Sequence, residues 1–296
     1  MGQGMQKIFC VLAMSAAAVA GAAQQPAEDP AAPLAPAVFA NQIPAAQLAF
    51  IQSYQGKRPK DLMKDKQFKA ILKLAIPSTT YHYGQDMSLR NAFELLIETD
   101  PLPIDIRDGR YAMAASHGGS YLDGRTFLWL DLQEGIVLGG VYFHPINGEP
   151  TPTLAIFSKQ LSGKMLAMGQ LPPAFIDDVY QWALVAKVPT ITVRYFIPAD
   201  GRKYMLEHDE DYCAHPPGAA PPEGCEQANA DAADADMNAA YFMKLTGNQA
   251  NATAWMLNGE QTAWLGQRES MCGAAGFACR IAITRQRTHV LTGRRR

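Results

Sequence analysis

Hydrophobic residues near the start of the folded part of the chain recur at helical spacing. Two such stripes are Leu48, Ile51 and Tyr54, and then Phe68, Ile71, Leu72 and Ala75. Pro77 follows the second stripe and should end its helix, because proline cannot continue the hydrogen-bonded ladder. A third helix is predicted over Leu89–Ile97, with Ser88 as its N-cap. The folded part of the chain is therefore predicted to begin with helices, from Ala45 to Ile97.

The spacing changes in the middle of the chain. Four short runs rich in aromatic and β-branched residues follow one another: Arg110–Ala115, Thr126–Leu132, Ile136–Phe143 and Thr153–Ser158. Turn-forming pairs separate or precede them: Asp108-Gly109, Asp123-Gly124, Glu134-Gly135 and Asn147-Gly148. This arrangement predicts an antiparallel β-meander.

A helix over Ala174–Ala186 and two strands, Thr190–Ile197 and Tyr204–Glu207, are predicted next. Because the helices precede most of the sheet, the predicted fold class is α+β, and we assign this domain to residues 45–208. Residues 209–296 form a second, small α-helical domain in this interpretation. Its three predicted helices are Glu226–Leu245, Ala250–Met271 and Cys279–Thr292.

The N-terminal residues have the composition of an export signal. Lys7 precedes an apolar run from Ile8 to Ala20, and small residues follow at 20–23. This order predicts a signal peptide over residues 1–23, an uncleaved anchor helix being the alternative. Residues 24–44 are rich in Ala and Pro and are predicted to be a linker. We therefore expect a bacterial-type exported protein that is periplasmic or secreted and not membrane-bound after cleavage.

Outside the predicted signal the chain has four cysteines: Cys213, Cys225, Cys272 and Cys279. An even number of cysteines in an exported chain predicts two disulfides, for which three connectivities exist. Pairing of sequence neighbours, Cys213 with Cys225 and Cys272 with Cys279, is the simplest of the three. A zinc site is the rival interpretation, but zinc ligands are usually paired two to four residues apart.

Charge and motifs exclude several classes of function. The chain has 26 Lys and Arg residues against 28 Asp and Glu residues, a balance that argues against a general nucleic-acid binder. The segment Ser116–Gly119 contains the His-Gly-Gly found in esterase oxyanion loops, but the chain has no G-x-S-x-G nucleophile motif. No zinc-protease, Walker or EF-hand motif occurs. We therefore expect no catalytic residues, no cofactor and no metal.

Residues 213–291 resemble the lysozyme inhibitor LprI-type domain. The motif that carries this resemblance comprises Cys213, Cys225, Leu257, Gln261, Trp264, Arg268, Cys272, Cys279, Arg287 and Leu291. In this interpretation Gln261, Trp264 and Arg268 are structural residues. Trp264 would supply core together with Leu257, and Arg268 would tie down a helix end. The Pro-rich loop 216–222 departs from the family pattern.

Residues 105–143 are similar to the strand–loop–strand core of the Ivy-type inhibitors of vertebrate lysozyme. Tyr111, His117, Arg125, Trp129 and Tyr142 carry this resemblance. It implies that a protruding loop binds the partner, through Ser116, His117, Gly118, Gly119, Ser120 and Tyr121. The cysteines that close this loop in the family are absent here, so the loop should be less pre-organised and bind more weakly. A plain hairpin loop is the alternative.

Together the resemblances imply an exported binding protein that inhibits lysozyme or another peptidoglycan hydrolase by blocking its cleft. Nine acidic residues and no Lys or Arg lie between Glu207 and Asp236, and this acidic stretch would steer encounter with a basic enzyme. An envelope structural or assembly module that binds a periplasmic partner is the alternative. A hydrolase is the third possibility, and it would need a cleft with a perturbed carboxyl or histidine.

Overall fold

The central sheet is built from strands whose two faces are both buried. Every residue is buried in β5 (Arg125–Asp131), β6 (Ile136–Phe143) and β7 (Thr153–Phe157). The computed structural model describes residues 38–82, 85–118, 124–143, 152–209, 211–214, 216, 223–247, 251–273 and 276–293. The predicted signal peptide and residues 24–37 of the predicted linker lie outside these ranges, so both stay predictions.

The sheet has eight strands in the order β3-β4-β5-β6-β7-β9-β10-β8. Its other strands are β3 (Asp105–Arg107), β4 (Tyr111–Ala115), β8 (Leu166–Ala167), β9 (Val193–Ile197) and β10 (Tyr204–Glu207). Neighbours from β3 to β7 are antiparallel, which confirms the predicted meander. The pairing of β9 with β7 is parallel, because α5 (Pro173–Val185) returns the chain to the same end of the sheet.

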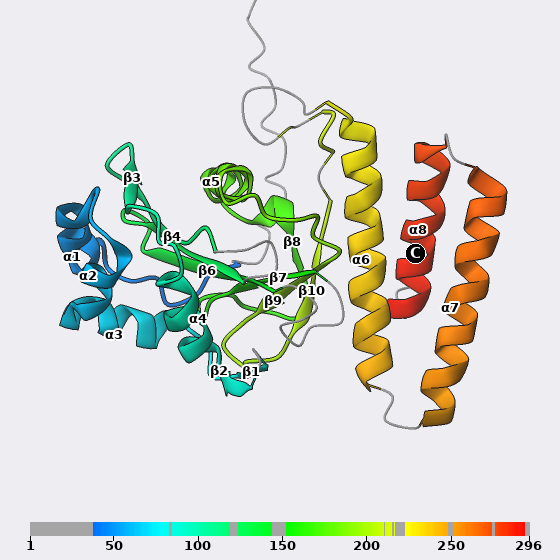
Figure 1. Cartoon of the computed structure of the whole chain (residues 1–296), viewed down its shortest axis with the longest axis horizontal. Coiled ribbons are helices and arrows are strands. Elements are labelled where there is room, and N and C mark those ends of the chain that lie inside the picture. Colours follow the sequence, from blue (N-terminus) through cyan, green and yellow to red (C-terminus); the bar gives the residue numbers. More distant parts are fainter. Residues whose placement is uncertain are drawn as a thin grey trace, which may run out of the picture. The chain divides into compact units, whose positions relative to one another are not determined.

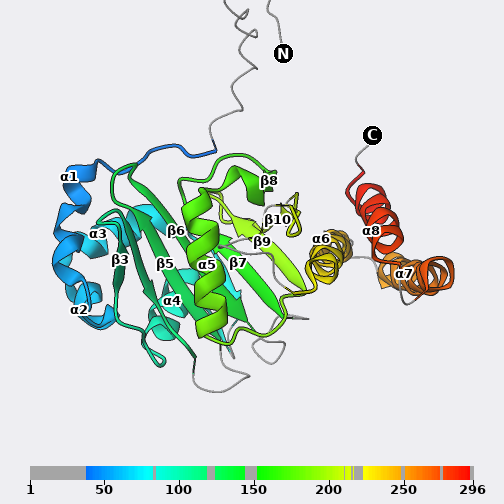
Figure 2. The ribbon, with the colours of Figure 1, turned by 90° about the horizontal axis from the view of Figure 1, so that it is seen from above.

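Helices cover both faces of this sheet (Figures 1 and 2). Alternate residues of β5 face opposite sides, as the pleat of a strand requires. Phe127 and Trp129 belong to the hydrophobic cluster with α5, and Leu128 and Leu130 belong to the cluster with the N-terminal helices. Figure 2 shows α5 lying across one face of the strands. The α+β class is confirmed.

The N-terminal helices follow the predicted stripes. They are α1 (Ala45–Leu48), the 3₁₀ helix η1 (Ala49–Tyr54), α2 (Pro59–Lys64), α3 (Lys66–Ala75) and α4 (Leu89–Ile97). The first stripe begins at Leu48, the last residue of α1, and its other two residues, Ile51 and Tyr54, lie in η1, whose three-residue period matches their spacing. Ile76 is extended and ends α3, since it precedes Pro77. The Ser88 side chain accepts a hydrogen bond from the Asn91 N–H, which confirms the predicted N-cap.

Short elements complete this part of the fold. They are the hairpin of β1 (Thr80–His82) and β2 (Asp86–Ser88), and the 3₁₀ turn η3 (Met168–Gln170). No helix in the described ranges has both the length and the apolar character needed to cross a bilayer.

The three C-terminal helices are α6 (Cys225–Gly247), α7 (Asn251–Cys272) and α8 (Phe277–Thr292), each within two residues of its predicted bounds. Figure 1 shows them side by side, with α8 next to both α6 and α7. Disulfides join Cys213 to Cys225 and Cys272 to Cys279, so the local pairing is correct.

One side of α6 packs against strands β9 and β10, near one edge of the sheet. Val193 and Tyr195 of β9 and Met205 of β10 form a hydrophobic cluster with Met237 and Ala240 of α6. The described residues from both predicted domains form one compact unit. At the boundary predicted near residue 209, the chain changes from a sheet with helices to helices alone. That this boundary separates independently folding domains stays a prediction.

Candidate functional site

A partly buried ionic network joins the three C-terminal helices. The Asp234 carboxylate of α6 accepts hydrogen bonds from Arg268 of α7 at 2.6 Å and from Arg280 of α8 at 2.5 Å. The Thr284 hydroxyl of α8 donates to the same carboxylate at 3.2 Å and accepts from Arg268 at 3.0 Å. One carboxylate thus fixes the positions of two helices relative to a third.

A second polar group lies nearby. Gln261 of α7 is buried; its Nε2 donates to the Met237 sulfur of α6, and its Oε1 accepts from Arg287 of α8 at 3.1 Å. The guanidinium groups of Arg268 and Arg287 lie 5.2 and 5.8 Å from the ring centre of Trp264, within cation–π range. The predicted structural residues Gln261, Trp264 and Arg268 therefore all lie at contacts between helices. Arg268 reaches across to α6, whereas the sequence predicted that it would tie down a helix end.

The side of α7 that points away from α6 and α8 faces solvent. Among the α7 residues whose exposure is described, only Leu257, Gln261 and Arg268 are buried. Trp255 is 79% exposed, Met256 59% and Met271 62%. At Gly259 and Gly266 a side chain would meet no atom within 4 Å.

We call the solvent-facing side of α7 around Trp255 and Met256 the α7 outer face. Two neighbouring large apolar side chains with this exposure are poorly explained by folding alone, because exposed apolar groups that cluster often mark interaction sites.

These helices match a known family. Residues 213–291 match the family model described as "Lysozyme inhibitor LprI". The predicted resemblance to that domain is therefore confirmed, and we refer to residues 213–291 as the LprI-like region. The family is described as an inhibitor, which favours a binding protein over an enzyme. No curated protein and no solved structure matches the chain. The similarity of residues 105–143 to Ivy-type inhibitors stays a prediction.

The LprI-like region contains both disulfides and all three C-terminal helices. It also contains the ionic network around Asp234 and the α7 outer face. The matched segment is therefore a cross-linked helical unit that presents one long helix to solvent.

The predicted partner-binding loop lies outside this region, and its first residues are held in the fold. Ser116 is fully buried, its hydroxyl accepts a hydrogen bond from the Thr126 N–H, and its carbonyl accepts one from Trp182 Nε1 at 3.0 Å. Gly118 has a φ of +69°, and a Cβ there would lie 2.9 Å from the Arg125 side chain. Ser116 and Gly118 therefore position the loop, and they present no side chain to a partner.

His117 lies between them and is half-buried. Its Nδ1 lies 3.5 Å from Oδ2 of Asp100, and its Nε2 is buried with no hydrogen-bond partner within the described part of the chain. Gly119, Ser120 and Tyr121 lie outside the described residues. The partner-binding role of this loop stays a prediction, and His117 is the residue through which it can be tested.

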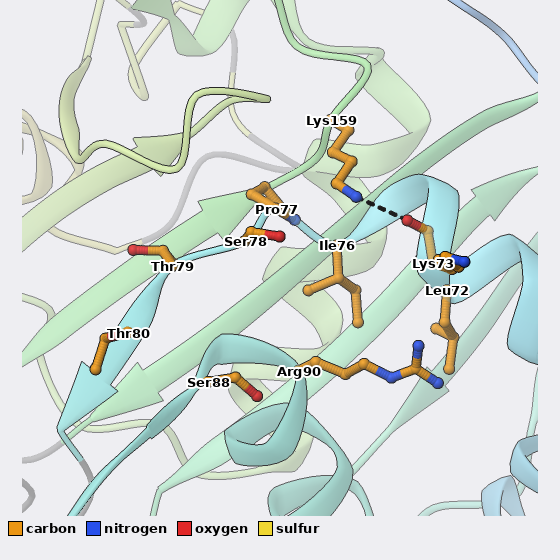
Figure 3. A pocket seen from close by; sticks show the side chains of 10 residues that line it. All are labelled: Leu72, Lys73, Ile76, Pro77, Ser78, Thr79, Thr80, Ser88, Arg90 and Lys159. Carbon is orange, nitrogen blue, oxygen red and sulfur yellow. Dashed lines mark hydrogen bonds between the residues drawn. The ribbon is translucent and has the colours of Figure 1, made fainter.

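A basic hollow of about 480 Å³ lies on the α+β domain, away from the LprI-like region. Lys73, Arg90 and Lys159 line it together with four hydroxyl-bearing residues, Ser78, Thr79, Thr80 and Ser88. Figure 3 shows Lys159 reaching to the carbonyl oxygen of Lys73, a hydrogen bond of 2.8 Å. Arg90 donates to Glu94 at 2.7 Å. Because these two cations already have partners, the hollow is a weaker binding site than its composition indicates.

A titratable pair lies where α6 meets β10. His208 and Asp236 are both largely buried, and Asp236 Oδ2 accepts a hydrogen bond from the His208 backbone N–H at 2.8 Å. Burial raises the pKa of Asp236 to about 6, against the opposing effects of this hydrogen bond and of Arg194 and Arg285. Burial also lowers the pKa of His208 well below 6.5, and the same two arginines add to that shift.

Sequence reasoning missed Asp234 and Asp236 as individual residues. Both stand in an Ala- and Asp-rich segment in which solvated and buried acids look alike. One signal in the sequence could have indicated that Asp234 points inward. It stands three residues before Met237, and residues at this spacing lie on the same side of a helix, here at the edge of the predicted apolar stripe.

Proposed function

We propose that this chain is an exported, periplasmic protein that inhibits lysozyme or another peptidoglycan hydrolase by binding to it, without catalysis of its own. The observation that carries the proposal is the match of residues 213–291 to the LprI family. The predicted export signal supports the compartment in which such an enzyme would be met.

The α7 outer face is the contact surface that the geometry favours. Trp255 is the most exposed of the large apolar side chains, and tryptophan is among the residues that most often dominate binding energy. The Cys272–Cys279 disulfide joins α7 to α8, and the Asp234 network joins α7 and α8 to α6, before any partner arrives. Such pre-organisation reduces the entropy lost on binding.

Charge supplies long-range attraction in this proposal. Asp234 and Asp236 of the acidic stretch are turned inward. Asp209, Glu223 and Glu226 are exposed and remain available to attract a basic enzyme. We therefore expect a modest, salt-dependent effect on the association rate.

The direct test adds the purified chain to a panel of lysozymes and follows both cell-wall lysis and complex formation by calorimetry. We expect slower lysis and a measurable complex with at least one enzyme. Normal lysis and no complex with any enzyme of the panel would contradict the proposal.

Two variants locate the contact surface. Trp255→Ala should weaken the complex about thirtyfold, the effect of losing one binding hot spot. Leu184→Ala is the matched control, because Leu184 is also exposed, at 57%, but lies on α5. His117→Ala tests the predicted loop. If His117→Ala weakens the complex and Trp255→Ala does not, the partner contacts the loop and not α7.

The envelope-module alternative makes a different prediction. An exposed apolar helix face also suits a structural protein partner, so the α7 outer face by itself does not separate the two functions. Capture of periplasmic proteins on the immobilised chain distinguishes them. Recovery of an envelope complex without any peptidoglycan hydrolase would favour the alternative.

A further inference from the structure

A second cavity, of about 410 Å³, lies between α5, the sheet and the first half of α6. Its volume falls within the usual range for small-molecule sites, roughly 300–1,000 Å³. Most of its wall is apolar, and representative lining residues are Leu154, Ile156, Phe175, Val179, Leu206 and Ala232. These side chains come from strands and helices distant in the sequence, so the cavity is part of the framework of the fold.

One part of the wall is polar. Arg194, His208, Tyr212 and Asp231 also line the cavity. The ring of His208 contacts the Tyr212 hydroxyl. Asp231 accepts a hydrogen bond from Gln227 at 2.6 Å and lies 3.8 Å from Arg280, so its carboxylate is engaged on α6 and α8. The cavity thus has an apolar body and a polar end.

Arg194 is the residue that gives the polar end a positive charge. Its neighbours Val193 and Tyr195 pack in the cluster with α6, so strand alternation places Arg194 on the other face of β9, toward the cavity. Its Nη1 is buried and has no hydrogen-bond partner in the part of the chain that the structure describes. A buried donor without a partner is costly, and a bound acceptor would remove that cost.

The buried acid Asp236 does not fulfil this role. Asp236 interacts electrostatically with Arg194, but Asp236 does not line the cavity, and its Oδ2 accepts from the His208 backbone N–H. Arg194 thus lines the cavity and has a buried Nη1 with no acceptor among the described residues. A carboxylate suits this guanidinium best, because it can accept two parallel hydrogen bonds from arginine.

We propose that this cavity binds a free carboxylic acid with a medium-length acyl chain. The acyl chain would occupy the apolar body between α5 and the sheet, and the carboxylate would accept hydrogen bonds from Arg194. This site is distinct from the α7 outer face, so it would add a ligand to the protein whether or not the protein inhibits a hydrolase.

Titration calorimetry with three probes tests the proposal on the unmodified chain. Decanoate carries both the acyl chain and the acid, decanol lacks the acid, and acetate lacks the chain. We expect decanoate to saturate one site per chain, decanol to bind about tenfold more weakly, and acetate not to bind. Equal affinity for decanoate and decanol, or no binding of decanoate, would overturn the proposal.

Two variants place the ligand in this cavity. Arg194→Gln should weaken decanoate binding about tenfold and leave decanol binding unchanged. Ala183→Phe, on the half-exposed wall of α5, should weaken both probes because it fills the apolar body. Arg202→Gln is the matched control, an exposed arginine in the turn before β10. Decanoate affinity that is unchanged in both cavity variants would place the ligand elsewhere and overturn the assignment.

Discussion

Arg268 of α7 and Asp234 of α6 form an ion pair with 2.6 Å between Nη1 and Oδ1, and their side chains are only 7% and 19% exposed. A buried pair of this kind is costly to break, because the remaining charge has no solvent to stabilise it. The pair therefore fixes the position of α7 relative to α6 in the LprI-like region.

Asp234→Asn tests this pair. The variant keeps the size of the side chain but leaves Arg268 and Arg280 without their shared carboxylate. We expect it to lower the free energy of unfolding by about 3–5 kcal/mol. Urea unfolding, followed by tryptophan fluorescence and by circular dichroism, measures the loss.

Asp231→Asn is the matched control one turn earlier on α6. Asp231 is half-exposed and lies 3.8 Å from Arg280, so its loss should cost less than about 1 kcal/mol. Equal effects of the two substitutions would show that the Asp234 network does not stabilise the helices in the way described.

The disulfides should stabilise the LprI-like region locally. They join residues 12 and 7 positions apart in the sequence, and loops of this size contribute about 2–3 kcal/mol each. Replacing both cysteines of one bridge by serine should therefore increase amide hydrogen exchange in α6, α7 and α8. Exchange in β5, β6 and β7 serves as the internal control, and an equal increase there would contradict a local role.

The pair of Asp236 and His208 predicts a specific dependence of stability on pH. Burial raises the pKa of Asp236 from 3.8 to about 6, so its contribution to stability is present below about pH 4 and is lost as pH rises to about 6. Burial lowers the pKa of His208 from 6.5, so its contribution is present above about pH 6.5 and is lost as pH falls. The two effects oppose each other in the native protein.

Asp236→Asn removes one of these two effects. The amide side chain of the variant keeps an oxygen acceptor for the His208 N–H but cannot titrate. Relative to the native chain, the variant should gain up to about 3 kcal/mol of stability between pH 4 and pH 7. Arg194, Arg285 and Asp209 are the other charged groups that act on Asp236, and they are unchanged.

Denaturant unfolding at a series of pH values measures this gain. Asp209→Asn is the matched control, because Asp209 is an exposed acid that also acts on Asp236, and its replacement should change the pH profile much less. A constant difference between Asp236→Asn and the native chain at all pH values would rule out the assigned pKa shift.

Local patterns predicted most of the elements of this fold. Ser88 and Pro77 marked the limits of helices, and the turn signals at Gly109 and Gly135 preceded β4 and β6, because caps and turns depend on neighbouring residues. The predicted turn at Asn147-Gly148 lies outside the described residues. The short strands β3 and β8 were missed, since three or two residues carry too little pattern. The parallel pairing of β7 with β9 was also missed, because it depends on contacts distant in the sequence.

The candidate sites were harder to predict. The cysteine pairs and Gln261, Trp264 and Arg268 were found from a motif with fixed spacing. The exposure of Trp255 and the orientation of Arg194 depend on which face of a helix or strand is covered by another element. Asp234 was counted in an acidic surface stretch, although it is an internal partner of two arginines.

One titration measures whether this chain inhibits a peptidoglycan hydrolase by binding to it, as we propose. The rate of peptidoglycan lysis by a responsive lysozyme is measured at increasing concentrations of the chain, and the Trp255→Ala variant is measured in parallel. We expect lysis to fall to a low residual rate with the native chain, and the variant to need about thirtyfold more protein for the same effect. Full lysis at every concentration of the native chain, with each lysozyme of the panel, would contradict the proposal.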